Sequence, residues 1–450
     1  MKVMTGKLPL ALFCAALVLA APPAARKILP YPAVQEDLPN GLRLVTVTTD
    51  FPNIVALYIV VGAGSRNEVE PGHTGFAHLF EHLMSKGTPE YSEEQYTAAL
   101  RRMGADDNAY TTDDYTCFYT VFSKEDLPTV LKMEADRFQH LKYTPAAFKT
   151  ETLAVLGEYN KDSSSPFEKL DEAMDDTAFT TSTYKHTTMG FLKDVEAMPG
   201  EYDYSLQYFN RYYRPEYTTI LVVGDVKPRA TRQIVDKYWG AWQRGDYRPA
   251  IPREPAQEGP RQSHVDWAGP TLPMVEMGYK GPAYTDAAPD TAALEAVAAL
   301  AFSQTSPLYQ KLVIEDQKAD LLYAQAPERV DPSLFEILAR VKQPDDVNYV
   351  EGQILDTIQA LRDHPVDAAR LEAVKKHLRY AAALEMNSND AIAGLLAVFV
   401  ALRRTPETMD RLFEQYAALT PEDVQKAAAK YLVENNRTTV TLSAAGGGAQ

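Results

Sequence analysis

The segment His78-Leu79-Phe80-Glu81-His82 contains three side chains whose types and spacing suit metal-dependent hydrolysis. Histidines four residues apart project from one face of a helix, one turn apart, so both imidazoles can bind the same ion. Glu81 adjoins this face and can act as a general base on a water that the metal activates. We therefore expect a metal site here, the alternative being two histidines that bind no ligand.

A third protein ligand is expected, because a catalytic zinc ion takes three and leaves one position open for water. The order H-x-x-E-H is that of the inverted zincin motif. Glu151 and Glu158 are seven residues apart in a helical pattern, which places them on one face two turns apart. One of them can bind the metal while the other orients a ligand. By spacing alone, a solvated helix face explains these acids at least as well.

Strands and helices alternate around these residues, and the order of elements recurs in the second half of the chain. In the first half we expect strands at 42–48, 54–61, 115–122 and 218–225, and helices at 75–83, 92–103, 125–138 and 146–161. In the second half we expect strands at 274–279, 334–341 and 438–442, and helices at 291–302, 347–361, 368–384 and 421–431. This repetition indicates an internal duplication. The predicted fold class is α+β, with two homologous domains that each pack helices on a mainly antiparallel sheet.

A proline-rich stretch separates the two halves. Prolines at 249, 252, 255 and 260 prevent a helix or a central strand there, so an extended connector is expected. The predicted organisation is a signal peptide at 1–25, an N-terminal domain with the metal site at 26–243, a linker at 244–262, a C-terminal domain at 263–445 and a disordered tail at 446–450. Residues 291–302 contain no histidine, so the C-terminal domain is expected to lack a metal site.

Charge and the N-terminal segment limit the partners and the compartment. The chain of 450 residues has a net charge of −16, which argues against a general nucleic-acid binder. Lys2 and Lys7 precede a short apolar stretch and small residues, the pattern of a secretory signal peptide. This stretch is too short for a stable membrane span, although a retained N-terminal anchor is an alternative. We expect export to the periplasm or the extracellular space.

The sequence resembles the insulinase/pitrilysin family of zinc peptidases, which includes the mitochondrial processing peptidases. The resemblance covers most of the chain after the signal peptide and is most specific at 74–84 and 86–88. Glu151 and Glu158 fall where that family has its paired glutamates, and 213–215 with 222–225 is similar to its end-of-domain pattern. The resemblance implies a single half-clam chain of the processing-peptidase kind.

The resemblance also assigns roles to the candidate residues. It implies that Zn²⁺ is the cofactor, with His78, His82 and Glu158 as its ligands. Glu81 is then the catalytic base, and Glu151 supports the site without binding the metal.

The segment Asn108-Ala109-Tyr110-Thr111 is a further match. In the family, the similar segment is an edge strand near the metal that pairs with the backbone of a peptide substrate. Main-chain pairing ignores side-chain identity, so it accepts many sequences. The alternative is an ordinary turn that leads into a strand.

One departure from the family concerns catalysis. Many members have an arginine and, seven residues later, a tyrosine that hold the substrate and stabilise the oxyanion. Here Val313 occupies the arginine position, and Tyr323 follows only ten residues later. Either Tyr323 acts with another basic residue, or a second chain supplies the pair. We favour the second chain, in a homodimer or in a heterodimer with another family subunit.

The sequence thus predicts an exported zinc metalloendopeptidase that cleaves short unfolded peptides. The alternative is a non-catalytic structural or assembly subunit of a peptidase-like complex. The complete set of His78, Glu81, His82 and Glu158 argues against that alternative, whereas Val313 argues for it.

Overall fold

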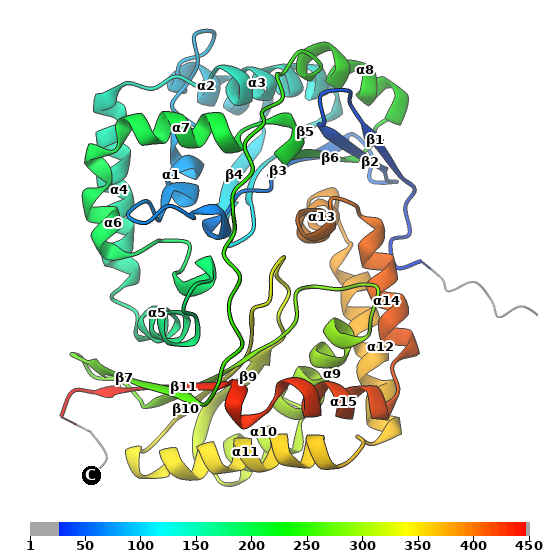
Figure 1. Ribbon diagram of the computed structural model, residues 1–450. Helices are drawn as coiled ribbons and strands as arrows, with labels where there is room; N and C mark the ends of the chain where they lie inside the picture. Colours follow the sequence, from blue (N-terminus) through cyan, green and yellow to red (C-terminus); the bar gives the residue numbers. More distant parts are fainter. Residues whose placement is uncertain (1–26, 447–450) are drawn as a thin grey trace, which may run out of the picture.

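The computed structural model describes residues 27–446. The expected signal peptide at 1–25 and all but the first residue of the expected tail lie outside the described residues. Within them, the chain forms two halves, each with one sheet and a set of helices (Figure 1). The α+β prediction with two homologous, mainly antiparallel domains is confirmed.

The sheet of the first half has six strands in the order β1-β2-β6-β3-β5-β4. Their bounds are β1 Ala33–Asp37, β2 Arg43–Thr48, β3 Ile54–Val61, β4 Asp106–Thr111, β5 Thr116–Ser123 and β6 Thr218–Gly224. Strands β3 and β6 are almost continuous apolar runs because helices or the second half cover both of their faces. Among the described strand pairs of this sheet, only β2 and β6 are parallel.

The sheet of the second half repeats this arrangement with five strands in the order β7-β11-β8-β10-β9. Their bounds are β7 Arg261–Trp267, β8 Met274–Lys280, β9 Ala319–Gln325, β10 Leu334–Val341 and β11 Arg437–Ala444. Its one described parallel pair, β7 with β11, takes the place of β2 with β6. Apart from β1, the two sheets therefore have the same strand order, as expected for a duplication.

Helices complete each half. In the first they are α1 Phe76–Leu83, α2 Glu93–Met103, α3 Leu127–His140, α4 Pro145–Asp162, α5 Pro166–Ala178, α6 Leu192–Ala197, α7 Tyr202–Tyr212 and α8 Pro228–Trp239. In the second they are α9 Asp290–Phe302, α10 Pro307–Tyr309, α11 Val347–Asp363, α12 Ala368–Glu385, α13 Asn389–Arg403, α14 Glu407–Ala418 and α15 Pro421–Tyr431. None of the described helices combines the length and the apolar character that crossing a membrane requires.

The two halves exchange helices. Helix α13 of the second half packs on β3 and β6 of the first sheet, and α5 of the first half packs across β7, β11 and β8 of the second (Figure 1). Under α5, Leu170 and Met174 form an apolar cluster with Leu338 and other residues of the second sheet. Gly278 makes this close approach possible, since a Cβ at that position would lie 2.9 Å from the Met174 sulfur.

Polar contacts join the β4–β5 turn of the first half to the β9–β10 loop of the second. The Asp114 carboxylate accepts hydrogen bonds from the Tyr184 hydroxyl at 2.6 Å and from the Val330 backbone N–H at 2.9 Å. Two arginines add ion pairs across the same junction, Arg66 with Asp331 at 2.6 Å and Arg329 with Asp113 at 2.8 Å. These contacts fix the distance between the edge strands β4 and β9.

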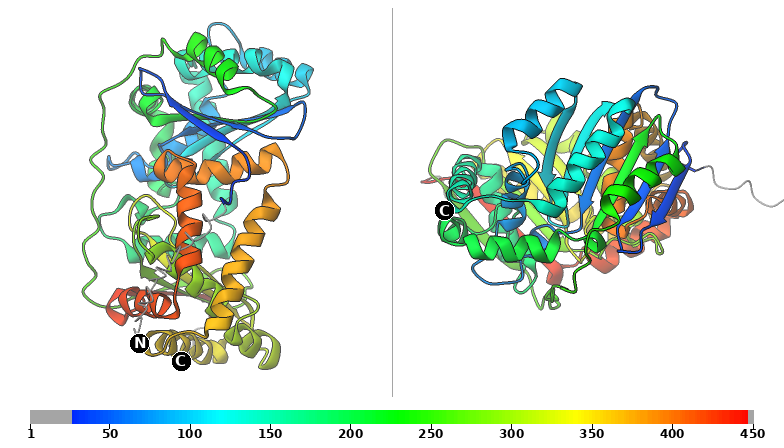
Figure 2. Two further views of the ribbon diagram at one scale, coloured as in Figure 1. Left: turned by 90° about the vertical axis from the view of Figure 1, so that its right-hand side faces the viewer. Right: turned by 90° about the horizontal axis from the view of Figure 1, so that it is seen from above.

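The connector runs along one side of the molecule between α8 and β7 (Figures 1 and 2). It forms no helix or strand up to residue 260, and β7 starts at Arg261, one residue before the expected end of the linker. The Glu254 carboxylate anchors it by accepting the Thr181 N–H at 2.9 Å and the Lys280 ammonium at 2.6 Å. Burial raises the pKa of Glu254, but these hydrogen bonds lower it more, to about 2. The connector is therefore held in place by specific contacts.

We predict that shortening a side chain in the exchanged-helix contact destabilises the whole chain. Leu170 is fully buried between α5 and the second sheet, so Leu170→Ala should lower the free energy of unfolding by about 2–5 kcal/mol. Leu384→Ala on α12 is the control, because Leu384 is 76% exposed and its loss should cost less than about 0.5 kcal/mol. Denaturant titration followed by tryptophan fluorescence measures both changes. Equal effects of the two variants would contradict the prediction.

Candidate metal centre

The helix that carries the histidines, α1, starts at a buried carboxylate. Glu68 accepts hydrogen bonds from the backbone N–H groups of Gly75 at 2.8 Å and Ala77 at 2.7 Å. It thereby pairs two of the donors that a helix leaves free in its first turn. Burial raises the pKa of Glu68 to about 8, although the N–H groups lower it in part. The start of α1 is thus fixed by a group that solvent does not reach.

Two glycines let the start of α1 approach a neighbouring loop. Gly75 has φ of +86°, and a Cβ there would lie 2.8 Å from the Met189 carbonyl oxygen. A Cβ on Gly190, whose φ is +78°, would lie 2.6 Å from the Gly75 nitrogen. The Thr74 hydroxyl donates to Asp194 on α6 at 2.8 Å in the same contact. The position of α1 is therefore fixed by backbone packing as well as by Glu68.

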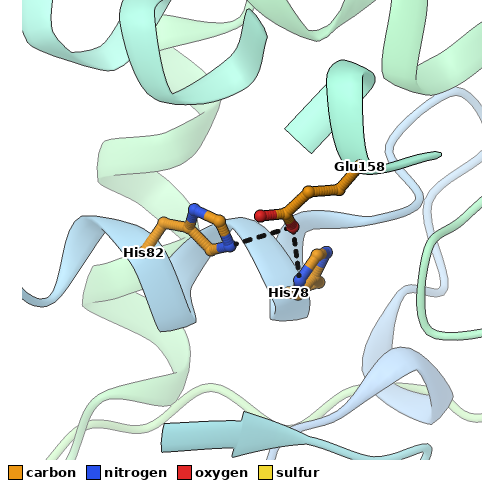
Figure 3. A group of neighbouring side chains, drawn as sticks. All are labelled: His78, His82 and Glu158. Carbon is orange, nitrogen blue, oxygen red and sulfur yellow. Dashed lines mark ion pairs between the residues drawn. The ribbon is translucent and has the colours of Figure 1, made fainter. Parts of the chain in front are cut away.

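The structure brings both histidines and Glu158 together (Figure 3). Glu158 projects from α4 toward α1, and its Oε2 lies 3.4 Å from the Nε2 atoms of both His78 and His82. One ligand atom from each of the three residues lies within 4.8 Å of the others. Among the described residues, this is the only such group of histidine, cysteine and acidic side chains.

This donor set fits a tetrahedral zinc ion. Bonds of about 2.0–2.2 Å at tetrahedral angles place ligand atoms about 3.3–3.6 Å apart, and the two measured separations fall in that range. Burial, with His82 nearby, lowers the pKa of His78 to about 4, so its imidazole is neutral and ready to bind a metal near pH 7. Two imidazole nitrogens and one carboxylate are a known catalytic zinc set.

Glu151 lies beside the donor set. Its Oε2 is 3.6 Å from Nδ1 of His82, and its Oε1 forms an ion pair with Lys86 at 2.9 Å. Lys86 also pairs with Glu93 at 2.9 Å. Glu151 is thus positioned to hold the His82 ring through the nitrogen that faces away from Glu158. This is the placement expected of a residue that orients a ligand.

Glu81, the predicted base, contacts the edge strand β4. It lies on α1 between the two histidines in sequence, and its Oε2 accepts a hydrogen bond from the Thr111 hydroxyl at 2.7 Å. Burial raises the pKa of Glu81, while Thr111 and His82 lower it in part. A raised pKa brings a carboxylate closer to the value suited to accepting and returning a proton at neutral pH.

The expected substrate strand is β4, an edge strand beside α1. It pairs with β5, and within the described residues no strand pairs with its other edge. Ala109 packs in the cluster that contains α1, and Thr111 contacts Glu81, whereas the Tyr110 hydroxyl lies 3.4 Å from that of Tyr115 in the opposite cluster. Asn108, the third residue of the strand, is exposed.

The structure does not bring Tyr323 into contact with the donor set. Tyr323 lies on β9 and lines a cavity between the halves that also contains Arg329. Val313 lies in the π-helical segment Gln310–Glu315 and packs against the apolar core, so an aliphatic side chain suits its surroundings. Arg329 is the only basic residue among those lining the cavity, and it is paired with Asp113.

Sequence reasoning missed the supporting roles of Glu68, Lys86 and Thr111. Glu68 is eight residues before the start of α1 and follows no capping pattern, so nothing in the sequence marks its role. Lys86 lies four residues after His82, and this helical spacing is a signal that could have placed it near the metal helix.

Comparisons with known proteins agree with this geometry. Residues 43–191 match the insulinase family, described as peptidase family M16, and residues 201–378 match the peptidase M16 inactive domain. The chain belongs to the M16 insulinase family. Zinc is the cofactor that this membership implies, and the donor set accommodates it.

Individual relatives span nearly the whole chain. The zinc protease PqqE of Helicobacter pylori is 27% identical over 90% of this chain and 91% of its own length. A probable mitochondrial-processing peptidase subunit beta of Schizosaccharomyces pombe is 24% identical over 91% of this chain and 90% of its own length. The crystal structure of a protease from Helicobacter pylori superposes with a TM-score of 0.86 at 25% identity, covering 92% of this chain and 99% of that one.

We predict that Glu151→Gln weakens zinc binding by about 10- to 100-fold, because the amide holds the His82 ring less well than the carboxylate does. Competition with a chromophoric chelator measures the affinity. Glu93→Gln is the matched control, since Glu93 shares Lys86 but does not approach a histidine. If both variants weaken binding equally, Lys86 rather than the Glu151 contact is responsible.

We predict that Glu68 makes stability depend on pH. Its pKa rises from about 4.3 in an unfolded chain to about 8 in the folded one, so the folded chain binds this proton more tightly. The contribution of this proton to the free energy of unfolding is present in full below about pH 4.3. It is lost as the pH rises to about 8, by at most about 1.4 kcal/mol per pH unit.

Unfolding titrations of the wild type and of Glu68→Gln, at about pH 5 and about pH 8, test this dependence. Glutamine loses an acceptor for the N–H groups of α1, so this variant should be less stable at both values. However, the difference in free energy of unfolding between the wild type and Glu68→Gln should be smaller at the higher pH, because only the wild type loses a stabilising proton there. A deficit that is equal at both values would show that Glu68 does not titrate between them.

Proposed function

We propose that this protein is a zinc-dependent endopeptidase that cleaves short unfolded peptides, with Glu81 as the general base. The observation that carries the proposal is the position of Glu81. Its carboxylate interacts electrostatically with His82 and Glu158 of the donor set, and it accepts a hydrogen bond from the Thr111 hydroxyl of the edge strand. A base, a metal-binding set and a strand able to pair with a peptide therefore meet at one place.

In this mechanism, His78, His82 and Glu158 hold the ion. Bound zinc makes a water acidic near neutral pH and polarises the scissile carbonyl group. Glu81 accepts the proton of the attacking water at Oε1 or Oε2 and then gives it to the leaving amine. The Thr111 hydrogen bond restricts how the Glu81 carboxylate can turn, which keeps it aimed at the donor set.

The free edge of β4 supports the choice of substrate. An extended peptide can add to this edge through main-chain hydrogen bonds, with its scissile bond near Thr111 and Glu81. A folded protein cannot present a chain in this way without unfolding locally. The substrate class is therefore unfolded peptides, and Asn108 to Thr111 provide the pairing surface.

We further propose that a second family subunit completes the oxyanion site. The Val313 side chain has no hydrogen-bond donor, and Arg329, the basic residue that lines the cavity with Tyr323, is paired with Asp113. A similar chain of Schizosaccharomyces pombe is named as a subunit. A heterodimer with a subunit that carries the pair meets this need, whereas a homodimer has Val313 in both copies and needs other donors. The N-terminal sequence pattern supports export to the periplasm or the extracellular space.

The second candidate function is that of a non-catalytic assembly subunit. It is favoured by Val313 and by a relative of Euglena gracilis, 27% identical over about half of each chain, which is named core protein I of the ubiquinol-cytochrome-c reductase complex. Such a subunit keeps the fold and the metal but hydrolyses nothing alone.

We predict that the purified chain, alone or mixed with its partner subunit, cleaves a quenched, unstructured peptide of a few tens of residues, and that a chelator abolishes this cleavage. Glu81→Gln should lower kcat about 100- to 10,000-fold with unchanged zinc content, because it removes the base but no ligand. Fluorescence release gives the rate, and elemental analysis gives the zinc content.

Glu158→Gln is the matched control, since it should lose both zinc and activity. Cleavage that persists in Glu81→Gln would refute the assigned mechanism. Zinc-loaded wild type that cleaves no peptide, alone or mixed with a candidate partner subunit, would favour the assembly subunit.

A further inference from the structure

Glu68, the buried carboxyl group that fixes the start of α1, faces a second buried side chain. The Nε2 atom of His186 lies 3.9 Å from Oε2 of Glu68, and the side chains of the two residues are only 4% and 0% exposed. His186 begins the loop at residues 186–191, which leads into α6. The fold thus joins the start of the metal-binding helix to a loop that supplies none of the three metal-binding side chains.

The surroundings of His186 fix which ring nitrogen carries a hydrogen. Its Nδ1 lies 2.9 Å from the Thr187 carbonyl oxygen, which can only accept a hydrogen bond, so Nδ1 must be the donor. In the neutral ring, Nε2 is then an acceptor. This atom is buried and has no hydrogen-bond partner among the described residues. A buried acceptor without a donor is costly, so Nε2 points to a proton that a neighbouring group must supply.

Glu68 can supply that proton. Burial raises the pKa of Glu68 to about 8 and lowers the pKa of His186, so near pH 7 the proton of this pair belongs on the carboxyl group. Without it, a carboxylate oxygen and a ring nitrogen, both acceptors, would face each other where solvent does not reach. One proton held between the two side chains removes this conflict.

The other titratable groups around the pair are not better donors. Those that interact with it electrostatically are Asp113, Asp194, Tyr204 and Tyr208. Asp113 forms an ion pair with Arg329. Asp194 accepts a hydrogen bond from the Thr74 hydroxyl at 2.8 Å. Burial raises the pKa of both tyrosine hydroxyls far above neutral, so neither gives up a proton near pH 7.

The pair is connected to the metal ligands through the backbone. Glu68 holds the N–H groups of Gly75 and Ala77, and Ala77 immediately precedes the ligand His78. The loop that carries His186 packs against the same turn of α1. Metal–ligand distances in proteins vary by only about 0.2 Å. A small displacement of Glu68 is therefore enough to disturb the donor set.

We propose that His186 is a positioning residue of the zinc centre, which acts by sharing one proton with Glu68. The shared proton provides Nε2 with a donor and restricts how the Glu68 carboxyl group can turn, so that the start of α1 stays in place. This inference rests on the zinc centre of the proposed function, but it does not require that the chain cleave a peptide.

Two substitutions separate the two sides of the ring. His186→Asn keeps a donor for the Thr187 carbonyl group but extends no further, whereas His186→Gln places an amide near the position of Nε2. We expect His186→Asn to weaken zinc binding about tenfold and His186→Gln to restore most of that loss. Competition with a chromophoric chelator measures the affinity.

His73→Asn is the control, because the Nε2 atom of His73 pairs with Glu201 and not with Glu68. This variant should bind zinc as the wild type does. Wild-type affinity in His186→Asn, or an equal loss in His73→Asn, would overturn the assignment.

A double-mutant cycle shows whether His186 acts through Glu68. In a Glu68→Gln background, His186→Asn should change the zinc affinity by less than about twofold, because the shared proton is already absent. Losses that multiply, as they do for independent sites, would overturn the proposal. Thermal unfolding at the same pH checks that each variant folds.

Nitrogen NMR tests the shared proton in the wild type, and so does not depend on whether Glu68→Gln folds. With labelled histidine, the His186 signals, identified from their loss in His186→Gln, should show a hydrogen on Nδ1. The Nε2 signal should shift as the pH passes about 8 and the pair loses its proton. A hydrogen on Nε2 instead of Nδ1, or an Nε2 signal that does not change across this pH, would overturn the proposal.

Cleavage assays keep this inference apart from the proposed function. If the wild type binds zinc but cleaves no peptide, alone or with a partner subunit, the proposed activity fails while the cycle still decides the role of His186. If the wild type cleaves peptides but the losses in the cycle multiply, the peptidase stands and the positioning role fails.

Discussion

The exchange of helices between the two sheets is the contact on which the rest of the structure depends. Without α13, the inner face of β3 and β6 would expose a continuous apolar surface, and without α5 the second sheet would do the same. Burial of these faces adds to the core that the first half forms by itself on the other side of its sheet. The relative position of the two halves is therefore set by packing in their cores.

This exchange also positions the chemistry. Helix α5 begins four residues after α4, the helix that carries Glu151 and Glu158. The packing of α5 on the second sheet therefore limits where the end of α4 can lie, and with it the distance from Glu158 to α1. The same helix lines the cavity that contains Tyr323 and Arg329, so the metal centre and this cavity share one structural support.

The strands that the sequence predicts are those with apolar runs, such as 54–61 and 218–225, which became β3 and β6. Strands β1 and β7 escaped prediction because they lie at sheet edges and are rich in exposed polar residues, as in Arg261–Trp267. The exchange itself could not be predicted, because α13 is apolar on most of its surface. Such a helix is recognisable as buried, but its sequence does not say against which sheet.

For the candidate site, the spacing of residues in the sequence was enough to predict the two metal ligands that lie on one helix, His78 and His82. The third ligand depended on family resemblance, because many acids lie at helical spacing and only the fold selects Glu158. Glu276 and Glu336, which line the same cavity as Tyr323, were passed over, although each is the one acid in a mostly apolar strand. That pattern is a usable signal, since a charge in a buried strand requires a partner.

The strand order has a consequence for how the chain is made. Strand β11 lies between β7 and β8, so the second sheet has a gap in its middle until residues 437–444 have been synthesised. The first sheet likewise waits for α13, more than 160 residues after its own last strand, β6. A growing chain of this protein therefore holds open, unpaired surfaces for most of its synthesis. The fold is complete only after its last segments have been synthesised. Factors that bind unfolded chains can therefore act on this protein during most of its synthesis.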